Sequence, residues 1–249
     1  MDVHHPHHPT HKKLPKEYLL EFLMLFLAVS MGFAAENIRE EIVERRREVG
    51  YLQGVHHDLQ NDVRDIDSTT AFIDVKQTLS DSLFAAIQSQ RIAHDLPGLY
   101  YYVKTFSPRR QFENSDNGFA QLRAAGGFRL IRNDEIIRGI QAYEANVRSI
   151  MSLQEFNENI LVNYRLKSAR LMDAVTSTEM NDRQTMTTGV LERFRRPERP
   201  RPFVSTDRQD MNELFNLAFS TANTNKYIKN RLLRLKEQAL ALDRVIVRE

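Results

Sequence analysis

Residues 18–35 read YLLEFLMLFLAVSMGFAA, the one strongly apolar run of the chain. A helix needs about 20 predominantly apolar residues to cross a bilayer, and this run approaches that length when Glu21 extends toward the headgroups. Tyr18 and Lys16 are suited to the membrane interface. We therefore predict a membrane span over residues 18–35. Its marker residues are Tyr18, Phe22, Phe26, Phe33 and Ala35.

Two other interpretations fit the same run. A cleaved signal peptide would carry small residues at its cleavage site, as Gly32 and Ala34 do here. The core helix of a soluble protein can be equally apolar. No Gly or Pro separates the run from Glu36, and the helical pattern continues beyond that residue. This continuity favours a retained span.

The composition favours one helical domain behind the span. Hydrophobic residues make up 41% of the chain, and there are only 9 Gly and 8 Pro in 249 residues, which favours long helices over a turn-rich β fold. The absence of cysteine excludes disulfides and cysteine nucleophiles. A net charge of +2 leaves no general footprint for nucleic acid. We predict an all-α fold, in which the transmembrane helix continues into an extended, coiled-coil-like helical bundle.

We divide the chain into three parts. A flexible tail rich in His and Lys covers residues 1–17, the span covers 18–35, and a helical domain covers 36–249. Within the helical domain we expect long helices at about 36–95, 134–176 and 207–248, and a basic, proline-rich linker at 194–206.

Apolar residues alternate in steps of three and four along each expected long helix, as in packed or coiled helices. The first helix carries Val49, Leu52, His56, Leu59, Val63, Ile66, Thr70 and Ile73. The second carries Ile136, Ile140, Tyr143, Val147 and Ile150, followed by Phe156, Ile160, Tyr164 and Leu171. The longest seam lies on the last helix, and we predict it to be an interaction seam. Its main residues are Leu214, Ile228, Leu232, Leu235, Leu242 and Ile246, and Thr221 and Asn225 interrupt it either as register-fixing polar positions or as a solvated gap.

The boundaries between the helices follow from local signals. The tripeptide at 96–98, Leu-Pro-Gly, is expected to end the first helix, and Thr206 with Gln209 has the spacing of a capping box for the last one. Short helices are expected at 99–105 and 118–125. Alternation of apolar and polar residues at 128–130 indicates a short extended piece.

Two blocks of sequence carry a resemblance. One is EFLMLFLAV at 21–29, followed by Gly32-Phe33 and then Ala35-Glu36-Asn37. The other runs from Gly118 to Tyr143 and contains AGGFRLIRNDEI. Both blocks, behind a histidine-studded tail, resemble a family of uncharacterised single-span membrane proteins common in Bacteroidota. The resemblance implies an anchored helical domain and no known activity.

The tail is the one candidate metal site. Its imidazoles belong to His4, His5, His7, His8 and His11, and neutral imidazole suits Zn²⁺, Ni²⁺ and Cu²⁺. Pro6 and Pro9 favour a flexible chain without fixed ligand geometry, so opportunistic capture competes with a solvated or headgroup-facing tail. We therefore expect no resident cofactor.

The remaining polar candidates have simpler interpretations. Adjacent helical residues point about 100° apart, so His56 and His57 cannot both face one ion, and we interpret His56 as a core histidine and His57 as a surface residue. The first helix also carries four aspartates that we expect on a solvated face. They are Asp58, Asp62, Asp65 and Asp67.

The linker carries a basic cluster that can bind anionic headgroups or an acidic partner. Its residues are Arg193, Arg195, Arg196, Arg199 and Arg201. If the first two long helices are antiparallel, this linker returns toward the membrane.

The function expected from these features is not enzymatic, because no recognisable catalytic motif is present. We favour a membrane-anchored helical interaction module, either a self-associating scaffold or an accessory subunit of a membrane assembly. The expected partners are membrane lipid and a second copy or another membrane protein, with no nucleic acid. One alternative is an extracytoplasmic sensor that signals through a partner, and another is a divalent-metal-handling protein that uses the tail. Basic residues flank both ends of the span, and we expect a single-pass protein of the inner cell membrane with its helical domain outside the cytoplasm.

Overall fold

The structure is a computed structural model that describes residues 14–181 and 194–249. It confirms the all-α prediction, because the described residues form helices and no named strand. The α-helices are α1 (Pro15–Gln88), α2 (Leu96–Thr105), α3 (Asn117–Ala124), α4 (Asp134–Leu171), α5 (Ala174–Glu179) and α6 (Arg208–Ile246). Two short 3₁₀ helices, η1 (Arg91–Ala93) and η2 (Gly127–Arg129), lie between them. The chain divides into two compact units, Met1–Gly50 and Tyr51–Glu249, which we call unit 1 and unit 2.

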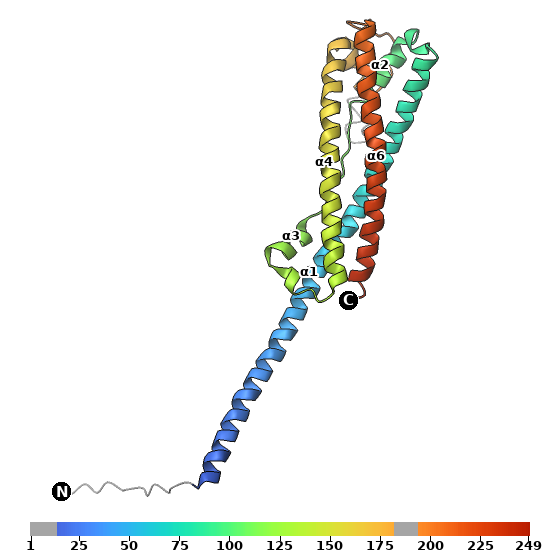
Figure 1. The fold of residues 1–249 in the computed structure, drawn as a ribbon. Helices are drawn as coiled ribbons and strands as arrows, with labels where there is room; N and C mark the ends of the chain where they lie inside the picture. The colour runs from blue at the N-terminus through green and yellow to red at the C-terminus, as the bar shows by residue number, and fades with distance from the viewer. Residues whose placement is uncertain (1–13, 182–193) are drawn as a thin grey trace, which may run out of the picture. The chain divides into compact units, whose positions relative to one another are not determined.

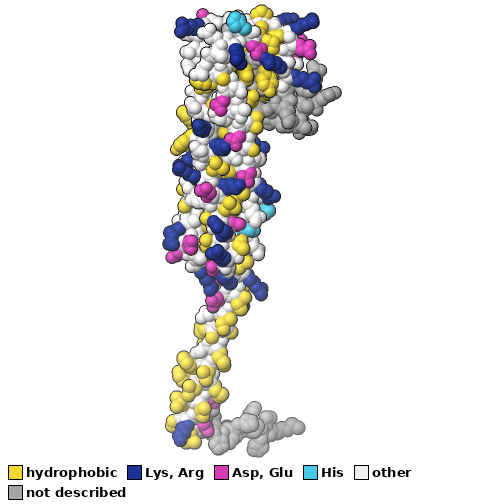
Figure 2. Space-filling view, turned by 90° about the vertical axis from the view of Figure 1, so that its right-hand side faces the viewer, with side chains coloured by type: hydrophobic (Ala, Val, Ile, Leu, Met, Phe, Trp, Pro, Cys, Tyr) yellow, Lys and Arg dark blue, Asp and Glu magenta, His cyan; other side chains and the backbone are white. Residues whose placement is uncertain are grey.

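The described part of unit 1 is almost entirely the N-terminal part of α1. This is the one described helix long and apolar enough to cross a membrane, with a mean hydropathy of 1.9 over its most apolar 18-residue window. None of that window is buried within the chain. Hydrophobic side chains cover the face of this segment that Figure 2 shows.

Unit 2 contains three long helices, the C-terminal half of α1 together with α4 and α6 (Figure 1). Asp67 of α1 accepts from Lys236 of α6 at 2.5 Å, and one heptad further along α1 Asp74 pairs with Lys229. Rising numbers on α1 therefore meet falling numbers on α6, so these helices are antiparallel. The same holds for α4 and α6, which lie side by side and are joined by side-chain hydrogen bonds along their length. Hence α1 and α4 run in the same direction, and residue 175 lies at the end of unit 2 opposite Tyr51.

The predicted seam of α6 is buried inside the chain. The six seam residues belong to two hydrophobic clusters built from α1, α2, α3, α4, α6 and the segments between them. Their burial shows that this apolar stripe is used for packing within the chain. The buried seam residues are Leu214, Ile228, Leu232, Leu235, Leu242 and Ile246.

The stripe on α4 departs from the prediction after Ile150. Phe156 is 59% exposed, whereas Gln154 and Asn157 are buried. The buried positions keep the alternating four-and-three spacing from Ile150 through residues 154, 157, 161 and 164, so the periodicity persists with polar residues in two of its positions. The prediction that Phe156 continues the stripe was wrong, because Gln154 and Asn157 take the buried positions there.

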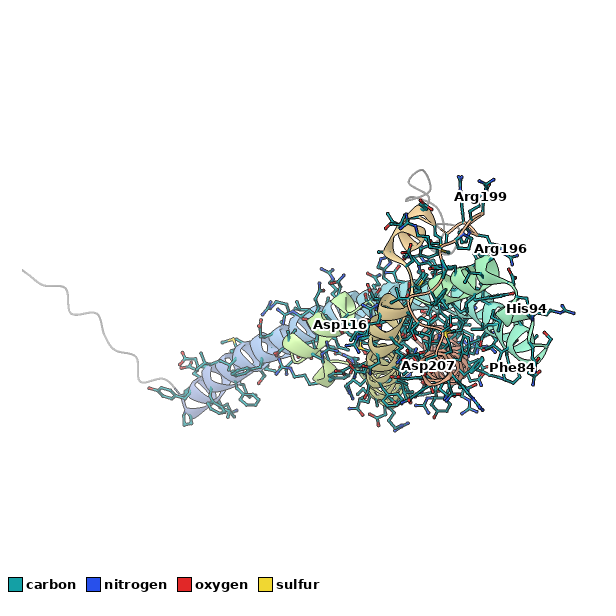
Figure 3. The ribbon with its side chains drawn as sticks, turned by 90° about the horizontal axis from the view of Figure 1, so that it is seen from above. Phe84, His94, Asp116, Arg196, Arg199 and Asp207 are labelled. Atoms are coloured by element: carbon teal, nitrogen blue, oxygen red, sulfur yellow. The ribbon has the colours of Figure 1, made fainter. Side chains whose placement is uncertain are left out.

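The ends of the long helices also differ from the prediction. Pro97 does not end α1; it lies in the first turn of α2, where the missing N–H is tolerated and where Asp95 caps the helix. Helix α4 ends at Leu171 because Met172 is extended and Asp173 caps the separate helix α5. The cap of α6 is Asp207 (labelled in Figure 3), whose carboxylate accepts from Gln209 N, in place of the predicted capping box. The stretch predicted to be extended at 128–130 contains η2.

Candidate functional site

The segment between α2 and α3, residues 106–116, has no helix or strand, and we call it the connector. Buried main-chain N–H and C=O groups need partners, and an irregular segment cannot supply them within itself. Side chains of α1 and α4 supply them here. The connector therefore brings polar contacts into the interior of unit 2.

Asp58 joins α1 to the start of α3. One carboxylate oxygen accepts from Gly118 N at 2.6 Å and from Phe119 N at 3.1 Å. These are among the first N–H groups of α3, which have no partner within the helix, and a negative charge is favourable at this end of the helix dipole. Asp58 is buried, so its hydrogen bonds replace water in an otherwise dry contact.

Asp62 and Asp65 continue the same row along α1. Asp62 accepts from Ser115 N and from the Tyr143 hydroxyl, each at 2.6 Å. Burial raises the pKa of Asp62 to about 6, against the hydrogen bonds from Tyr143 and Ser115 that lower it. Asp65 accepts from Glu113 N at 3.0 Å and from the Arg110 guanidinium at 2.9 Å.

The prediction of a solvated acidic face is thus wrong for Asp58 and Asp62. Both carboxylates are buried because main-chain N–H groups of residues 115–119 face them. Asp65 is partly exposed, and Asp67 is mostly exposed beside Lys236. The sequence spacing placed Asp58, Asp62 and Asp65 on one face, but only the fold shows that the connector covers it.

Lys76 holds the other end of the connector. Its ammonium group donates to the carbonyl oxygens of Thr105 at 3.0 Å and Phe106 at 2.6 Å, where the carbonyl end of the α2 dipole favours a cation. It also lies 4.6 Å from the centroid of the Phe106 ring. Burial, together with the nearby charge of Arg165, lowers the pKa of Lys76 to about 7. Arg165 itself donates to the carbonyl of Ser107 at 2.8 Å.

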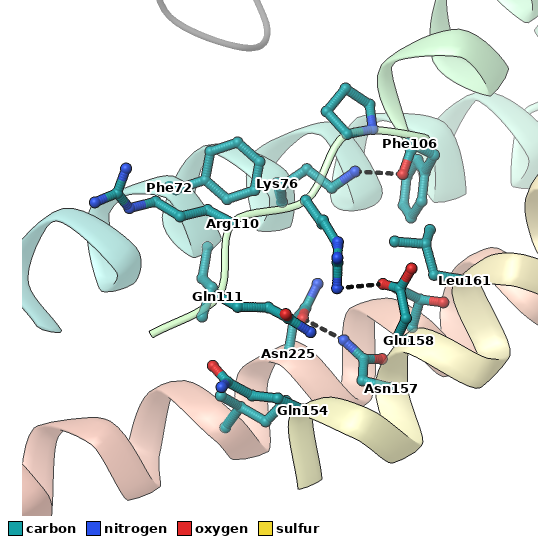
Figure 4. A pocket seen from close by; sticks show the side chains of 15 residues that line it. Phe72, Lys76, Phe106, Arg110, Gln111, Gln154, Asn157, Glu158, Leu161 and Asn225 are labelled. Carbon is teal, nitrogen blue, oxygen red and sulfur yellow. Dashed lines mark hydrogen bonds and ion pairs between the residues drawn. The ribbon is translucent and has the colours of Figure 1, made fainter. Parts of the chain in front are cut away.

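A small cavity lies beside Lys76, between the connector, α1, α4 and α6 (Figure 4). Gln154 bonds both main-chain groups of Phe112, at 2.8 Å to its N–H and 3.0 Å to its carbonyl. Asn157 Nδ2 donates to Asn225 Oδ1 at 2.7 Å across the α4–α6 interface. The cavity measures about 20 Å³. That is about the space of one water molecule and far below the roughly 300 Å³ at which small-molecule sites begin.

Several larger hollows lie on the surface of unit 2, and two of them lie between helices. One, of about 280 Å³, lies between α3 and α4 beside Phe119 and Met151, and the other, of about 350 Å³, lies between α1 and α6 beside Val63 and Leu240. Both are open and shallow. Neither brings together a nucleophile and a base in the arrangement that catalysis needs.

Of the described histidines, His56 makes side-chain contacts with two other residues. His56 Nδ1 lies 2.5 Å from an Asp243 carboxylate oxygen and His56 Nε2 lies 3.0 Å from Gln60 Nε2, so this residue links α1 to α6. Its side chain is 33% exposed, which corrects the prediction of a core histidine. The described residues contain no group of three or more His, Cys, Asp or Glu side chains able to hold a metal ion. The tail histidines His4, His5, His7, His8 and His11 lie outside the described residues.

The other predicted residues are found as follows. The span markers all lie in α1 and are exposed. The linker arginines Arg195, Arg196, Arg199 and Arg201 are also exposed, whereas Arg193 lies outside the described residues. Sequence reasoning missed Lys76, Gln154 and Asn157. A strict heptad count from Ile150 would have placed Gln154 and Asn157 inside, but Lys76 has no such signal.

Comparison with known proteins found no matching family model, curated protein or solved structure. Fold and site together define an all-α protein. Its described residues include one helix capable of crossing a membrane, and a helical unit whose buried polar side chains bind an irregular connector.

Proposed function

We propose that the protein is a membrane-anchored helical interaction module. The observation that carries the proposal is the exposed apolar surface of unit 1, where Phe22 is 64%, Leu25 68% and Phe33 69% exposed. Contiguous apolar surface of this size is unfavourable in water and is covered by lipid or by another protein. The length of the run, close to that of a bilayer core, supports lipid.

Membrane association is tested on the full chain expressed in cells. We expect the protein to stay with the membrane pellet after an alkaline carbonate wash, which strips peripheral proteins. Leu27→Arg places a charge near the middle of the run, at a cost of about 2.5–3.5 kcal/mol for insertion, and should shift the protein to the supernatant. Leu166→Arg is the matched control, because Leu166 is an exposed leucine of unit 2. Release of the unaltered chain by the wash contradicts anchoring.

The proposed role of unit 2 is to bind another protein as an accessory subunit. The seam that suggested self-association is buried in the chain's own core, so any contact between copies needs a different surface. The interior cavity is too small for a metabolite, which favours binding on the outside. Extraction in mild detergent followed by native mass measurement tests this role. A strictly monomeric particle without a partner argues against it.

The proposed orientation keeps the tail in the cytoplasm and unit 2 outside. Large domains cross membranes largely regardless of their own charges, so a short basic tail ahead of the span decides the direction. The chain has no cysteine, so Asn223→Cys on the exposed surface of α6 gives a single label site. We expect a membrane-impermeant maleimide to label it from outside the inner membrane. Labelling only after cell lysis would show that unit 2 lies in the cytoplasm and would contradict the proposed orientation.

A further inference from the structure

Residues 194–203, read as FRRPERPRPF, show a burial pattern with a period of three. Every third residue faces the bundle and the two between are exposed. We call this stretch the arginine segment. Its inward residues are Phe194, Pro197, Pro200 and Phe203, and its outward residues are Arg195, Arg196, Glu198, Arg199, Arg201 and Pro202. A period of three is that of an extended, proline-rich chain with one apolar side.

The backbone of the arginine segment is held by two hydrogen bonds, and a third holds the residue after it. Arg195 N donates to the Met180 carbonyl at 2.9 Å, and Arg201 N donates to the Thr176 hydroxyl at 3.1 Å. Just beyond the segment, Val204 N donates to the Leu171 carbonyl at 2.8 Å. Near its end the buried Phe203 ring packs on Tyr100, with centroids 4.5 Å apart.

These contacts hold the arginine side chains on a fixed backbone. A partner that binds them does not have to order the chain, which removes part of the entropy cost of association.

The segment carries more basic than acidic side chains. Four arginines and one glutamate give residues 194–202 a net charge of +3, from 4 − 1. Arg196 pairs with Asp95, but both side chains are about half exposed, so water and salt weaken the pair. Among the described residues Arg199 has no ion-pair partner. Figure 3 shows Arg196 and Arg199 projecting on the same side of unit 2, with His94 nearby, and basic side chains crowd this end in Figure 2.

We propose that residues 194–202 form a docking surface for an acidic polypeptide, which rests on the role of unit 2 as an interaction module and names the chemistry of its partner. The arginine guanidinium presents paired N–H groups that match the two oxygens of a carboxylate. The outward residues come in three successive pairs along the segment, and each pair contains at least one arginine. The segment therefore offers several such contacts. An extended partner rich in Asp and Glu can use them together.

The surroundings disfavour another anionic partner. Single-stranded nucleic acid needs exposed aromatic rings for stacking, but Phe203 is buried and Phe194 lies beneath Lys104, 5.7 Å from ring centroid to Nζ. Within unit 2 the segment contacts Asp95, which follows α1. Anionic lipid headgroups are compared with the acidic peptide directly in the test.

The test uses the full chain in detergent micelles and a fluorescent oligoglutamate peptide as the probe. Binding is followed by fluorescence anisotropy at low and at physiological salt. The triple variant Arg196→Ala, Arg199→Ala, Arg201→Ala removes three exposed side chains. We expect its affinity for the peptide to fall about tenfold or more. The control variant Arg138→Ala, Arg148→Ala, Arg234→Ala removes the same charge from exposed positions on α4 and α6 and should leave the affinity nearly unchanged.

Three results would overturn the proposal. These are the absence of peptide binding at low salt, an equal loss in both triple variants, and tighter binding of phosphatidylglycerol vesicles or a single-stranded oligonucleotide through the same arginines. Circular dichroism of each variant confirms that the helices are intact. A failed peptide test leaves the carbonate extraction result unaffected, so the partner proposal and membrane anchoring stand or fall separately.

Discussion

Gly118 at the start of α3 lies directly against the backbone of Gly54 on α1. A β-carbon at position 118 would stand 2.2 Å from the carbonyl carbon of Gly54 and 2.3 Å from its oxygen. Neither of these backbone atoms can move without disturbing α1. This contact brings Gly118 N within 2.6 Å of Asp58, so the close approach and the buried hydrogen bond depend on each other.

Gly118→Ala should therefore destabilise unit 2 by about 2–3 kcal/mol, the usual scale for overpacking. Urea unfolding of the full chain in detergent, followed by circular dichroism, measures the loss. Gly50→Ala is the control, because nothing lies within 4 Å of a β-carbon there and alanine favours helix by about 0.5–1 kcal/mol. Equal unfolding midpoints for Gly118→Ala and the unaltered chain would show that α3 does not pack on α1 in this way.

The sequence was sufficient to predict the long helices and the α6 seam. Apolar residues spaced alternately by three and four over five heptads indicate a packed helix and no other structure. It could not predict the burial of Asp58 and Asp62. Their partners include main-chain N–H groups more than fifty residues away. Because nearly every residue has such a group, the sequence does not show which one will bond to a given aspartate. Pro97 shows a related limit, since a proline suits the first turn of one helix as well as the end of another.

The stability of unit 2 should depend on the ionisation of Asp62. Its folded pKa of about 6 exceeds the unfolded value of 3.8, so the fold favours the protonated carboxyl. That contribution is fully present below about pH 4 and is lost as the pH rises through 6. Asp62→Asn should flatten this part of the curve in urea unfolding between pH 4 and 7.

Tyr143→Phe provides the companion variant for Asp62. Removing the Tyr143 hydroxyl takes away a hydrogen bond that lowers the pKa of Asp62. The decrease of the unfolding free energy with pH should then persist but extend to higher pH. If Asp62→Asn leaves the slope as it is, another group causes the dependence.

Lys76 should give the opposite dependence at higher pH. Its folded pKa of about 7 lies below the unfolded value of 10.5, so the unfolded chain binds more protons between these limits. Stability therefore rises with pH from about 7 to 10. Lys76→Met removes the titrating amine and should abolish this rise, which pH-dependent urea unfolding would detect. If stability still rises with pH in Lys76→Met, the rise comes from another amine, such as Lys104. Burial also lowers the pKa of Lys104.

The pair Asn157 and Asn225 should behave as a unit. Asn157 is buried on the α4 seam, and its amide nitrogen bonds Asn225 on α6. Leucine at either position alone leaves the other amide without this partner, at a cost of about 1–3 kcal/mol. Leucine at both replaces a polar pair by an apolar contact and should recover most of the loss, because neither amide then remains unpaired. A double-mutant cycle of unfolding free energies measures the coupling. Additive losses in the double variant would mean that the two side chains do not depend on each other, and that another polar contact fixes the register of α4 against α6.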